Sequence, residues 1–403
     1  MNRTTSIVLA LAALVAIIAA VVVNRAHAPR SDVAAGEAWL APGLRDHVND
    51  VDKVVIKGAG DHVLATLARG AQGWTLAEKG GYAVDSGKLR ELVLKLADAK
   101  LVEEKTSNPD KYAALGVEDV TAAGAKGVLV TLEGLARPLS VIIGDSNPRG
   151  GSYVRRAGET QSWLTSASLA VDKDPVHWLR RDLVSLPASR IASVVVTHDD
   201  GKVVRIARHD AGDARFSLID VPKGREAGDA FAIDSIAGVL DGLTFDDVYM
   251  VKDAPAPTTA LGARFATADG IVVDLTGWER DGKHLATLSA SLDESAAIRG
   301  IEAAQARVKT EYAKAVADAA AIKEGDKAGD APIKPLAVTD AAKDRANRLK
   351  ALQDEVAAIN ARLGGWTFVL PAYKYANLDK PQAELLKPVA APVAVGKTRP
   401  TKR

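Results

Sequence analysis

The stretch Val54-Val55-Ile56 decides the fold, because its apolar pattern returns later in the chain as Val194-Val195-Val196. Four further motifs recur in the same order. They are Leu67-Ala68-Arg69 and Ile206-Ala207-Arg208, Trp74-Thr75-Leu76 and Phe216-Ser217-Leu218, Ala114-Leu115-Gly116 and Ala260-Leu261-Gly262, and Val128-Leu129-Val130 and Ile271-Val272-Val273. An ordered series of recurring motifs is typical of a duplicated structural unit. We therefore expect two similar units in tandem.

Each of the two expected units combines strands with one main helix. Alternation of apolar and polar side chains predicts strands in the first unit at residues 51–57, 62–69 and 74–78. A helical period then follows at Leu89, Leu92, Val93 and Leu96, and it returns at Ile236, Val239, Leu240 and Leu243. Asp85 or Ser86 can cap the first helix, and Asp234-Ser235 precedes the second quartet. The sequence predicts an α+β protein whose units each have a mainly antiparallel sheet and one main helix.

The recurring motifs also divide the chain into segments. The first unit spans residues 50–186, and the second spans residues 187–292 and 364–387. Residues 25–49 contain Pro and Gly without a sustained period, so we expect a tether there. The basic, proline-containing residues 388–403 are expected to form a disordered tail.

Residues 293–363 interrupt the second unit with a different pattern, in which apolar residues recur in alternating steps of four and three. One seam contains Ile301, Val308, Tyr312, Ala315, Ala319 and Ile322, with Gln305 as its polar member. The other seam contains Leu349, Leu352, Val356, Ile359 and Leu363. Seven-residue periodicity favours helices packed along their seams, and a short polar connection makes them antiparallel. We expect an inserted helical hairpin that projects from the body, and the alternative is a helical pair folded flat onto the sheets.

The apolar run at residues 7–23 predicts a membrane segment. At about 1.5 Å per residue, its length is at the short end of what a bilayer core requires. We interpret residues 1–24 as a cytoplasmic tip and a transmembrane anchor. The alternative is a cleaved signal peptide, because Ala26-His27-Ala28 resembles a cleavage site, although Pro29 follows it directly. The cations around this run do not determine its orientation.

Composition argues against several classes of function. The chain has 0 Cys, which excludes disulfides, thiolate metal sites and cysteine nucleophiles. Its formal net charge of +1 provides no general attraction to nucleic acid. Aromatic residues make up only 4% of the chain, too few for a platform that stacks single-stranded bases. We therefore expect no nucleic-acid partner.

The motifs of catalytic and metal sites are incomplete. Gly396-Lys397-Thr398 lacks the first glycine of a phosphate-binding loop, because Ala391 occupies that position. Gly144-Asp145-Ser146 lacks the second glycine of a nucleophile elbow. The 7 His residues are not spaced as metal ligands. We predict no enzymatic activity, no catalytic, cofactor-binding or metal-binding residues, and no cofactor.

Several motifs, taken in order, resemble a known family. They are Val54-Val55-Ile56, Gly73-Trp74-Thr75-Leu76, Tyr82-Ala83-Val84-Asp85, Lys111-Tyr112-Ala113-Ala114-Leu115-Gly116, Ile142-Ile143-Gly144 and Gly151-Ser152-Tyr153-Val154-Arg155. Over most of residues 50–292 and 364–387 the chain is similar to the uncharacterised bacterial envelope family called domain of unknown function 4340. The resemblance implies one amino-terminal span and a repeated α+β body outside the inner membrane. It also implies an accessory role, because relatives accompany transporter components that resemble gliding-motility ABC auxiliary proteins.

These observations lead to one main hypothesis and two alternatives. We expect a periplasmic, non-enzymatic accessory or scaffold protein that is anchored in the bacterial inner membrane by residues 7–23. Its hairpin, residues 294–363, would bind a protein partner, such as components of an ABC-type transporter or another envelope complex. One alternative is an envelope protein that binds a ligand or glycan in a cleft between the repeats. The other is a hydrolase assembled from distant residues.

Overall fold

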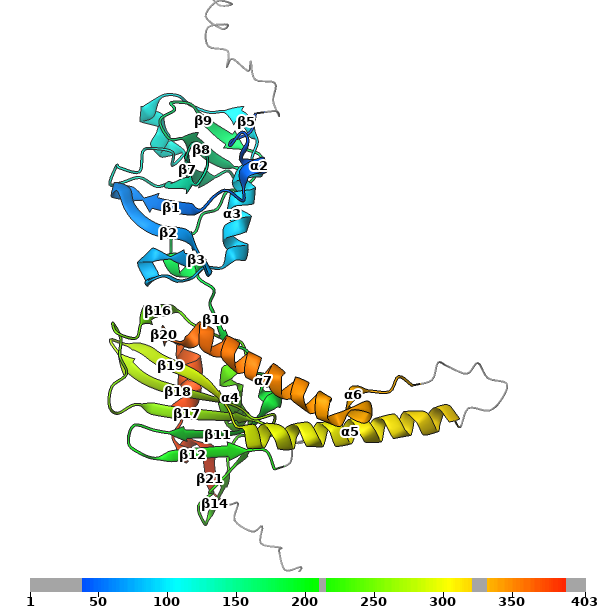
Figure 1. The fold of residues 1–403 in the computed structure, drawn as a ribbon. Helices are drawn as coiled ribbons and strands as arrows, with labels where there is room; N and C mark the ends of the chain where they lie inside the picture. Colours follow the sequence, from blue (N-terminus) through cyan, green and yellow to red (C-terminus); the bar gives the residue numbers. More distant parts are fainter. Residues whose placement is uncertain (1–37, 210–214, 321–331, 389–403) are drawn as a thin grey trace, which may run out of the picture. The chain divides into compact units, whose positions relative to one another are not determined.

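The structure is a computed structural model that describes residues 38–209, 215–320 and 332–388. The described chain forms two compact units, which divide between Leu179 and Arg180. Both units are α+β, with antiparallel sheets and helices (Figure 1). The α+β class predicted from the sequence is therefore confirmed.

The predicted membrane anchor lies outside the described residues, as does nearly all of the predicted tail. Among the residues that the structure does describe, no helix is both long enough and apolar enough to cross a bilayer.

The first unit contains a nine-stranded sheet with the order β4-β3-β2-β1-β6-β7-β8-β9-β5. Its strands are β1 (Lys53–Gly58), β2 (His62–Gly70), β3 (Gly73–Leu76), β4 (Tyr82–Ala83), β5 (Leu101–Glu104), β6 (Val128–Glu133), β7 (Leu139–Ser146), β8 (Ser152–Arg156) and β9 (Ser162–Thr165). The short helix α2 (Leu44–His47) precedes β1, and α3 (Ser86–Asp98) lies between β4 and β5 in the chain. Figure 1 shows α3 crossing one face of this sheet.

The core of the first unit forms where α3 covers the sheet. In β1, Val54 and Ile56 are buried while their neighbours are only partly covered, as the alternating pattern predicts. The four predicted helical positions, Leu89, Leu92, Val93 and Leu96, are all buried. The Asp85 side chain accepts hydrogen bonds from the backbone N–H groups of Gly87 and Lys88. The prediction that Asp85 caps this helix is confirmed.

The second unit contains an eight-stranded sheet with the order β13-β12-β11-β17-β18-β19-β20-β16. Its strands are β11 (Ile191–Thr197), β12 (Val203–Ala207), β13 (Ser217–Leu218), β16 (Asp247–Met250), β17 (Leu261–Thr267), β18 (Ile271–Arg280), β19 (Lys283–Leu292) and β20 (Trp366–Val369). Two further strand pairs join β10 (Asp182–Val184) to β15 (Leu243–Thr244), and β14 (Arg225–Ala227) to β21 (Leu386–Pro388). The helices are α4 (Ala230–Ala237), α5 (Glu294–Ala320), α6 (Leu336–Thr339), α7 (Ala341–Leu363) and α8 (Ala372–Leu378).

The two sheets have corresponding strand orders. Strand β1 lies between β2 and β6 in the first sheet, and β11 lies between β12 and β17 in the second. The registers of the first three strands also correspond. Val54 pairs with Leu67 and Leu67 with Leu76, while Val194 pairs with Ile206 and Ile206 with Leu218. The motif matches made for these three strands therefore fall on corresponding positions of the two sheets.

Two of the motif matches are wrong. Ala114-Leu115-Gly116 lies at the end of a 3-10 helix, whereas Ala260-Leu261-Gly262 lies at the start of β17. Val128-Leu129-Val130 lies on β6, which pairs directly with the first strand of its sheet. Ile271-Val272-Val273 lies on β18, and β17 separates it from β11. These last two motifs are apolar runs that follow a glycine, so residue type alone could not distinguish neighbouring strands of one sheet.

The helix of the second unit also differs from the prediction. Helix α4 begins at Ala230, and its cap is Asp229, whose side chain accepts a hydrogen bond from the backbone of Phe231. Asp234 lies inside α4 and accepts a hydrogen bond from the backbone N–H of Phe216. It therefore connects the helix to the start of β13 and does not cap it.

The predicted apolar quartet of this helix is divided among three elements. Ile236 lies in α4, Val239 and Leu240 lie in the 3-10 turn that follows, and Leu243 lies in β15. Helix α4 has 8 residues and α3 has 13. Gly238 and Gly242 account for the difference, because glycine is a weak helix former.

Candidate functional site

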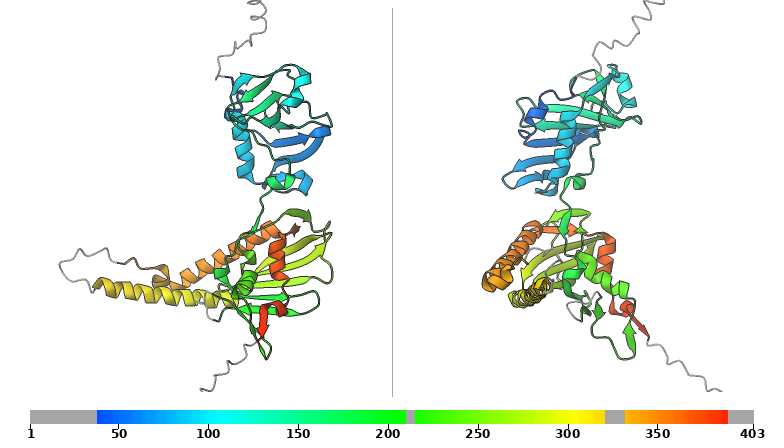
Figure 2. Two further views of the ribbon diagram at one scale, coloured as in Figure 1. Left: turned by 180° about the vertical axis from the view of Figure 1, so that it is seen from behind. Right: turned by 90° about the vertical axis from the view of Figure 1, so that its right-hand side faces the viewer.

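Helices α5 and α7 are antiparallel, and both extend from the same side of the second sheet. They come together at a distance from the sheet (Figures 1 and 2). At the junction, the amide nitrogen of Gln305 donates to Asp344 Oδ2 and to the carbonyl of Ala341, both at 2.8 Å. A Glu302 carboxylate oxygen lies 3.6 Å from an Arg345 guanidinium nitrogen beside it. The order of these contacts along the two helices makes them antiparallel.

The junction explains the one polar member of the predicted seam. Gln305 and Asp344 are each only 7% exposed, and Arg348 Nε donates to Asp344 Oδ2 at 2.8 Å. The hydrogen bond from Gln305, followed by the contact with Arg348, holds the pKa of Asp344 below its ordinary value. A buried polar contact that is satisfied in this way fixes the register of two helices.

The base of α7 belongs to the core of the second unit. Ile359 and Leu363 are 3% and 1% exposed. The side chain of Asn360 donates to the carbonyl of Ala290 in β19 and accepts from its N–H, both at 2.8 Å. This part of the hairpin lies against the sheet, as the alternative of a folded helical pair predicted.

Arg190 connects α7 to the turn between β17 and β18. Its guanidinium donates to Glu355 Oε1 at 2.7 Å and to Asp269 Oδ2 at 2.8 Å. The hydrogen bond with Glu355 raises the pKa of Arg190 more than any other contact. Helix α5 approaches the same turn closely, because a Cβ at Gly300 would lie 2.8 Å from the carbonyl oxygen of Ala268. Glycine is therefore required at this position in the second turn of α5.

Unlike the base of the hairpin, its far end exposes apolar side chains. Figures 1 and 2 show α5, the yellow helix, continuing past the point where α7 begins. On this distal part Val316 is 40% exposed, and on the returning chain Ile333 and Leu336 are 92% and 38% exposed. Ala337 of α6 is 1% exposed, because α6 packs against both α5 and α7. The predicted seam residue Ile322 lies outside the described residues.

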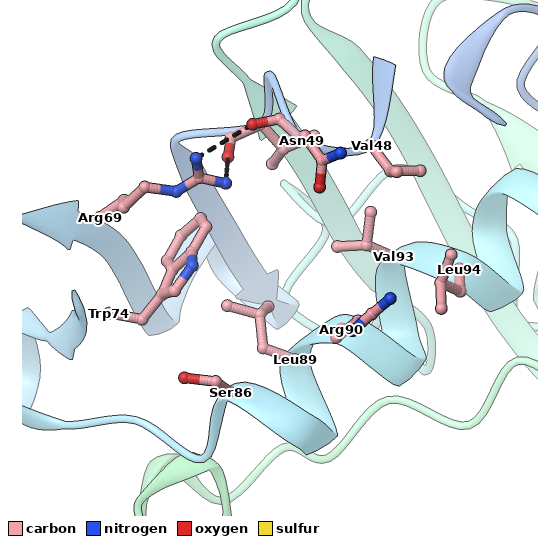
Figure 3. Close-up of a pocket in the computed structure, with 10 residues that line it drawn as sticks. Val48, Asn49, Arg69, Trp74, Ser86, Leu89, Arg90, Val93 and Leu94 are labelled. Atoms are coloured by element: carbon pink, nitrogen blue, oxygen red, sulfur yellow. Dashed lines mark hydrogen bonds between the residues drawn. The ribbon is translucent and has the colours of Figure 1, made fainter. Parts of the chain in front are cut away.

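The first unit contains a pocket of about 320 Å³, shown in Figure 3. Its lining comes from α3, from the chain between α2 and β1, and from β2 and β3. The apolar part of the lining consists of Val48, Val51, Trp74, Leu89, Val93 and Leu94. The polar part consists of Asn49, Arg69, Ser86 and Arg90, with no acidic side chain.

Arg69 forms a fixed part of this pocket wall. Its guanidinium donates to the carbonyl of Asn49 at 3.0 Å and to that of Val51 at 2.7 Å, and it lies 5.2 Å from the ring centroid of Trp74 (Figure 3). These contacts connect the end of β2 to the chain that enters β1. Its donors are engaged by the backbone, which indicates a structural role.

The same arrangement recurs in the second unit. Arg208 donates to the carbonyls of Ile191 at 2.9 Å and Ala188 at 2.8 Å, and it lies 4.4 Å from the ring centroid of Phe216. The sequence comparison had paired Arg69 with Arg208 as members of recurring motifs. The contact of each arginine with an aromatic ring and with the entering strand could not be recognised from those motifs.

The surroundings of the two aromatic rings differ. Phe216 is 5% exposed, whereas Trp74 is only half-buried and borders the pocket. Arg90 is the fifth residue after the cap of α3 and is exposed. The fifth residue after the cap of α4 is Asp234, whose side chain accepts a hydrogen bond from the backbone N–H of Phe216. Within the described ranges, the side chain of Arg90 makes no hydrogen bond or ion pair. This leaves one guanidinium at the pocket free to bind an anion.

The motif Gly144-Asp145-Ser146 has a structural explanation at the end of β7. The backbone N–H of Asp145 donates to the carbonyl of Leu115 at 2.9 Å. A Cβ at Gly144 would lie 2.2 Å from the same carbonyl oxygen. The glycine thus allows two backbone segments to approach closely.

The histidines are not gathered into a metal site among the residues that the structure describes, where no group of three His, Cys, Asp or Glu side chains could hold a metal ion. His198 begins a tight turn, in which the N–H of Gly201 donates to its carbonyl at 2.9 Å. Its ring nitrogen Nδ1 lies 3.4 Å from Asp379 Oδ1. His198 therefore has a structural place in a turn.

A contact beside α8 was missed in the sequence. The rings of His284 and Tyr375 are stacked, with 4.5 Å between centroids and 13° between planes. Burial, with a smaller effect of Asp379, raises the pKa of Tyr375 to about 12. A Cβ at Gly277 in β18 would lie 2.8 Å from the Tyr375 ring. A glycine inside a strand pattern was the available signal for this close approach.

Comparison with known proteins agrees with the expected resemblance. Residues 74–262 match the family model described as "Domain of unknown function (DUF4340)". The chain contains a DUF4340 domain. The matched stretch begins in β3 and ends in β17, so the DUF4340 match includes parts of both units. No curated protein and no solved structure matches the chain significantly.

Proposed function

We propose that the protein is a membrane-anchored, non-enzymatic accessory protein of the bacterial envelope whose helical hairpin binds a protein partner. Residues 7–23 are the anchor, and the bulk of the chain is periplasmic. The partner belongs to a membrane complex, with components of an ABC-type transporter as the first candidate. The choice of a transporter comes from the family resemblance, and the role of the hairpin comes from its geometry.

The distal part of the hairpin carries this proposal. The base of α7 is held by buried residues and by hydrogen bonds to the sheet, whereas Val316, Ile333 and Leu336 expose apolar surface at the other end. Tyr312 and Val316 are four residues apart on α5 and therefore lie on one helix face. Exposed apolar side chains on one helix face are typical of a surface that packs against a helix or groove of another protein.

Charge substitution on this face tests the proposal. Tyr312→Glu combined with Val316→Glu places two carboxylates on the predicted contact surface. Ala313→Glu combined with Ala317→Glu is the matched control, because it adds the same charges to exposed positions one residue further along. Full-length proteins are recovered from solubilised membranes by an affinity tag, and their partners are identified by mass spectrometry. We expect the first variant to lose transporter components and the control to retain them.

Equal recovery of the same components with both variants would contradict the role of the hairpin. A photo-crosslinking residue at position 316 provides a second measurement, and we expect crosslinks to the recovered component. Deletion of the whole hairpin is a weaker test, because it also removes Ile359 and Leu363 from the core of the second unit.

Protease treatment of spheroplasts tests the proposed location. If the bulk of the chain is periplasmic, external protease will digest both units of the full-length protein without detergent. A cytoplasmic marker protein must remain intact in the same sample. Protection of both units until the inner membrane is dissolved would contradict the proposed orientation.

We further propose that the two units are copies of one module. The corresponding strand orders and the matching registers of the first three strands support this view. The recurring arginine and aromatic pair supports it independently, because Arg69 and Arg208 make equivalent contacts. Experimental coordinates in which the paired strands of the two units fail to superpose would contradict the proposal.

A further inference from the structure

We propose that the pocket beside Trp74 binds a small organic anion with an apolar or aromatic body, and that Arg90 pairs with its negative charge. The pocket lies wholly within the first unit. Binding there does not depend on the hairpin or on its partner. Failure of this proposal would therefore leave the proposed function untouched.

The charges at the pocket select an anion. The residues that line it include two arginines and no acidic side chain. Arg69 donates to the backbone and stacks near the Trp74 ring, so it holds the wall in place. Arg90 is exposed and has no partner among the described residues. Its planar guanidinium can therefore donate two parallel hydrogen bonds to a carboxylate.

The apolar side chains of the pocket favour a ligand that is mostly apolar. Leu89 and Val93 are buried residues of α3, and the Trp74 ring forms the facing wall in Figure 3. A pocket of about 320 Å³ is at the small end of the range for organic ligands. This volume accommodates one aromatic ring with a short chain. The side chains of Asn49 and Ser86 add uncharged polar groups at the pocket.

The second unit shows that the fold does not require this space. Phe216, at the position equivalent to Trp74, is 5% exposed. Asp234, which lies as far from the cap of its helix as Arg90 does, accepts a hydrogen bond from the backbone N–H of Phe216 and so ties the helix to the aromatic residue. The arginine that stacks on the ring is present in both units. The first unit thus has the same arginine and aromatic pair, but it also has an open pocket with the unpaired guanidinium of Arg90 beside it.

Binding of a water-soluble probe tests the inference. The probe is 4-phenylbutyrate, measured by calorimetry against the full-length protein in lipid nanodiscs, with empty nanodiscs as the blank. The neutral 4-phenylbutanamide and the cationic 4-phenylbutylamine have nearly the same shape. We expect saturable binding of the carboxylate, weaker binding of the amide and no binding of the amine.

Two variants locate the site. Arg90→Gln is expected to weaken binding of the carboxylate roughly tenfold or more and to leave binding of the amide unchanged, because only the charged hydrogen bonds are lost. Leu94→Trp fills the pocket from its exposed edge and should abolish binding of both compounds. Arg149→Gln is the matched control, because Arg149 is an exposed arginine of the same unit that does not line the pocket.

Three results would overturn the inference. The first is the absence of saturable binding of the carboxylate to the unmodified protein. The second is equal binding of the carboxylate and the amine. The third is an Arg90→Gln variant that keeps the full preference for the carboxylate. Because Arg90 and Leu94 are exposed, circular dichroism should show that the variants fold like the unmodified protein.

Discussion

The first and second units contain the same arginine and aromatic pair in different surroundings. Arg69 and Trp74 border an open pocket, whereas Phe216 is buried beside a half-buried Arg208. In both units the arginine connects the end of the second strand to the chain that enters the first. The difference teaches that a packing contact can be retained while the space next to it is either filled or left open.

Removal of the aromatic ring should produce the largest difference in stability between the two units. We expect Phe216→Ala to lower the free energy of unfolding of the second unit by about 3 kcal/mol or more, because a buried ring leaves a cavity. Trp74→Ala should cost the first unit roughly half as much, because Trp74 is half-buried beside an existing pocket. Hydrogen exchange with mass spectrometry resolves the two units separately. A larger loss for Trp74→Ala would mean that its ring belongs to the core.

Removal of the guanidinium should have the next largest effect. We expect Arg208→Met to cost the second unit about 2 kcal/mol, since both hydrogen bonds lie in a partly buried region. Arg69→Met should cost the first unit about 1 kcal/mol, because one of its two hydrogen bonds is exposed. Urea denaturation followed by hydrogen exchange measures both. Equal losses of unfolding free energy would show that the exposure of these hydrogen bonds does not affect how much they stabilise each unit.

Alkaline pH should distinguish the units through Tyr375. Burial raises its pKa to about 12 in the folded protein, above the ordinary value of 10.0. The stabilisation is complete below pH 10 and is lost as the pH rises toward 12, because the unfolded chain releases the phenolic proton first. We expect this effect to reach roughly 2 kcal/mol. Unfolding of the second unit from pH 9 to 12 should therefore be less pH-dependent in Tyr375→Phe.

The helix caps should show the smallest difference. Asp85 accepts hydrogen bonds from two backbone N–H groups of α3, whereas Asp229 accepts one from α4. We expect Asp85→Ala to cost the first unit about 1 kcal/mol and Asp229→Ala to cost the second unit less. Hydrogen exchange in the first turn of each helix measures the change. Asp234→Ala serves as the reference, because Asp234 does not cap α4.

Local patterns predicted much of the fold. Alternation at Val54 and Ile56 identified a strand, and the spacing from Leu89 to Leu96 identified α3 with its cap at Asp85. The structure confirms each of these, because one buried face is enough to specify a strand or helix. Helix α4 was predicted less well, because Gly238 ends it early and because its cap is Asp229 instead of the predicted Asp234 or Ser235.

The pocket could not be predicted from the sequence. Its opening depends on the exposure of Trp74 and Arg90, and exposure is a property of the packed unit, not of a local pattern. The recurring motifs gave Trp74 and Phe216 equivalent positions, and they did not distinguish an open site from a filled one. The junction at Gln305 was visible only as a polar interruption of an apolar seam, without its partner Asp344.

Asn360 has a consequence for the solubility of the chain. Strand β19 pairs with β20 only at Leu285 and Ala286, so the rest of that side of β19 has no neighbouring strand among the described residues. The amide of Asn360 occupies both backbone groups of Ala290 there, as a further strand would. A chain that lost α7 would present this edge to other copies and would be prone to aggregate through intermolecular strand pairing.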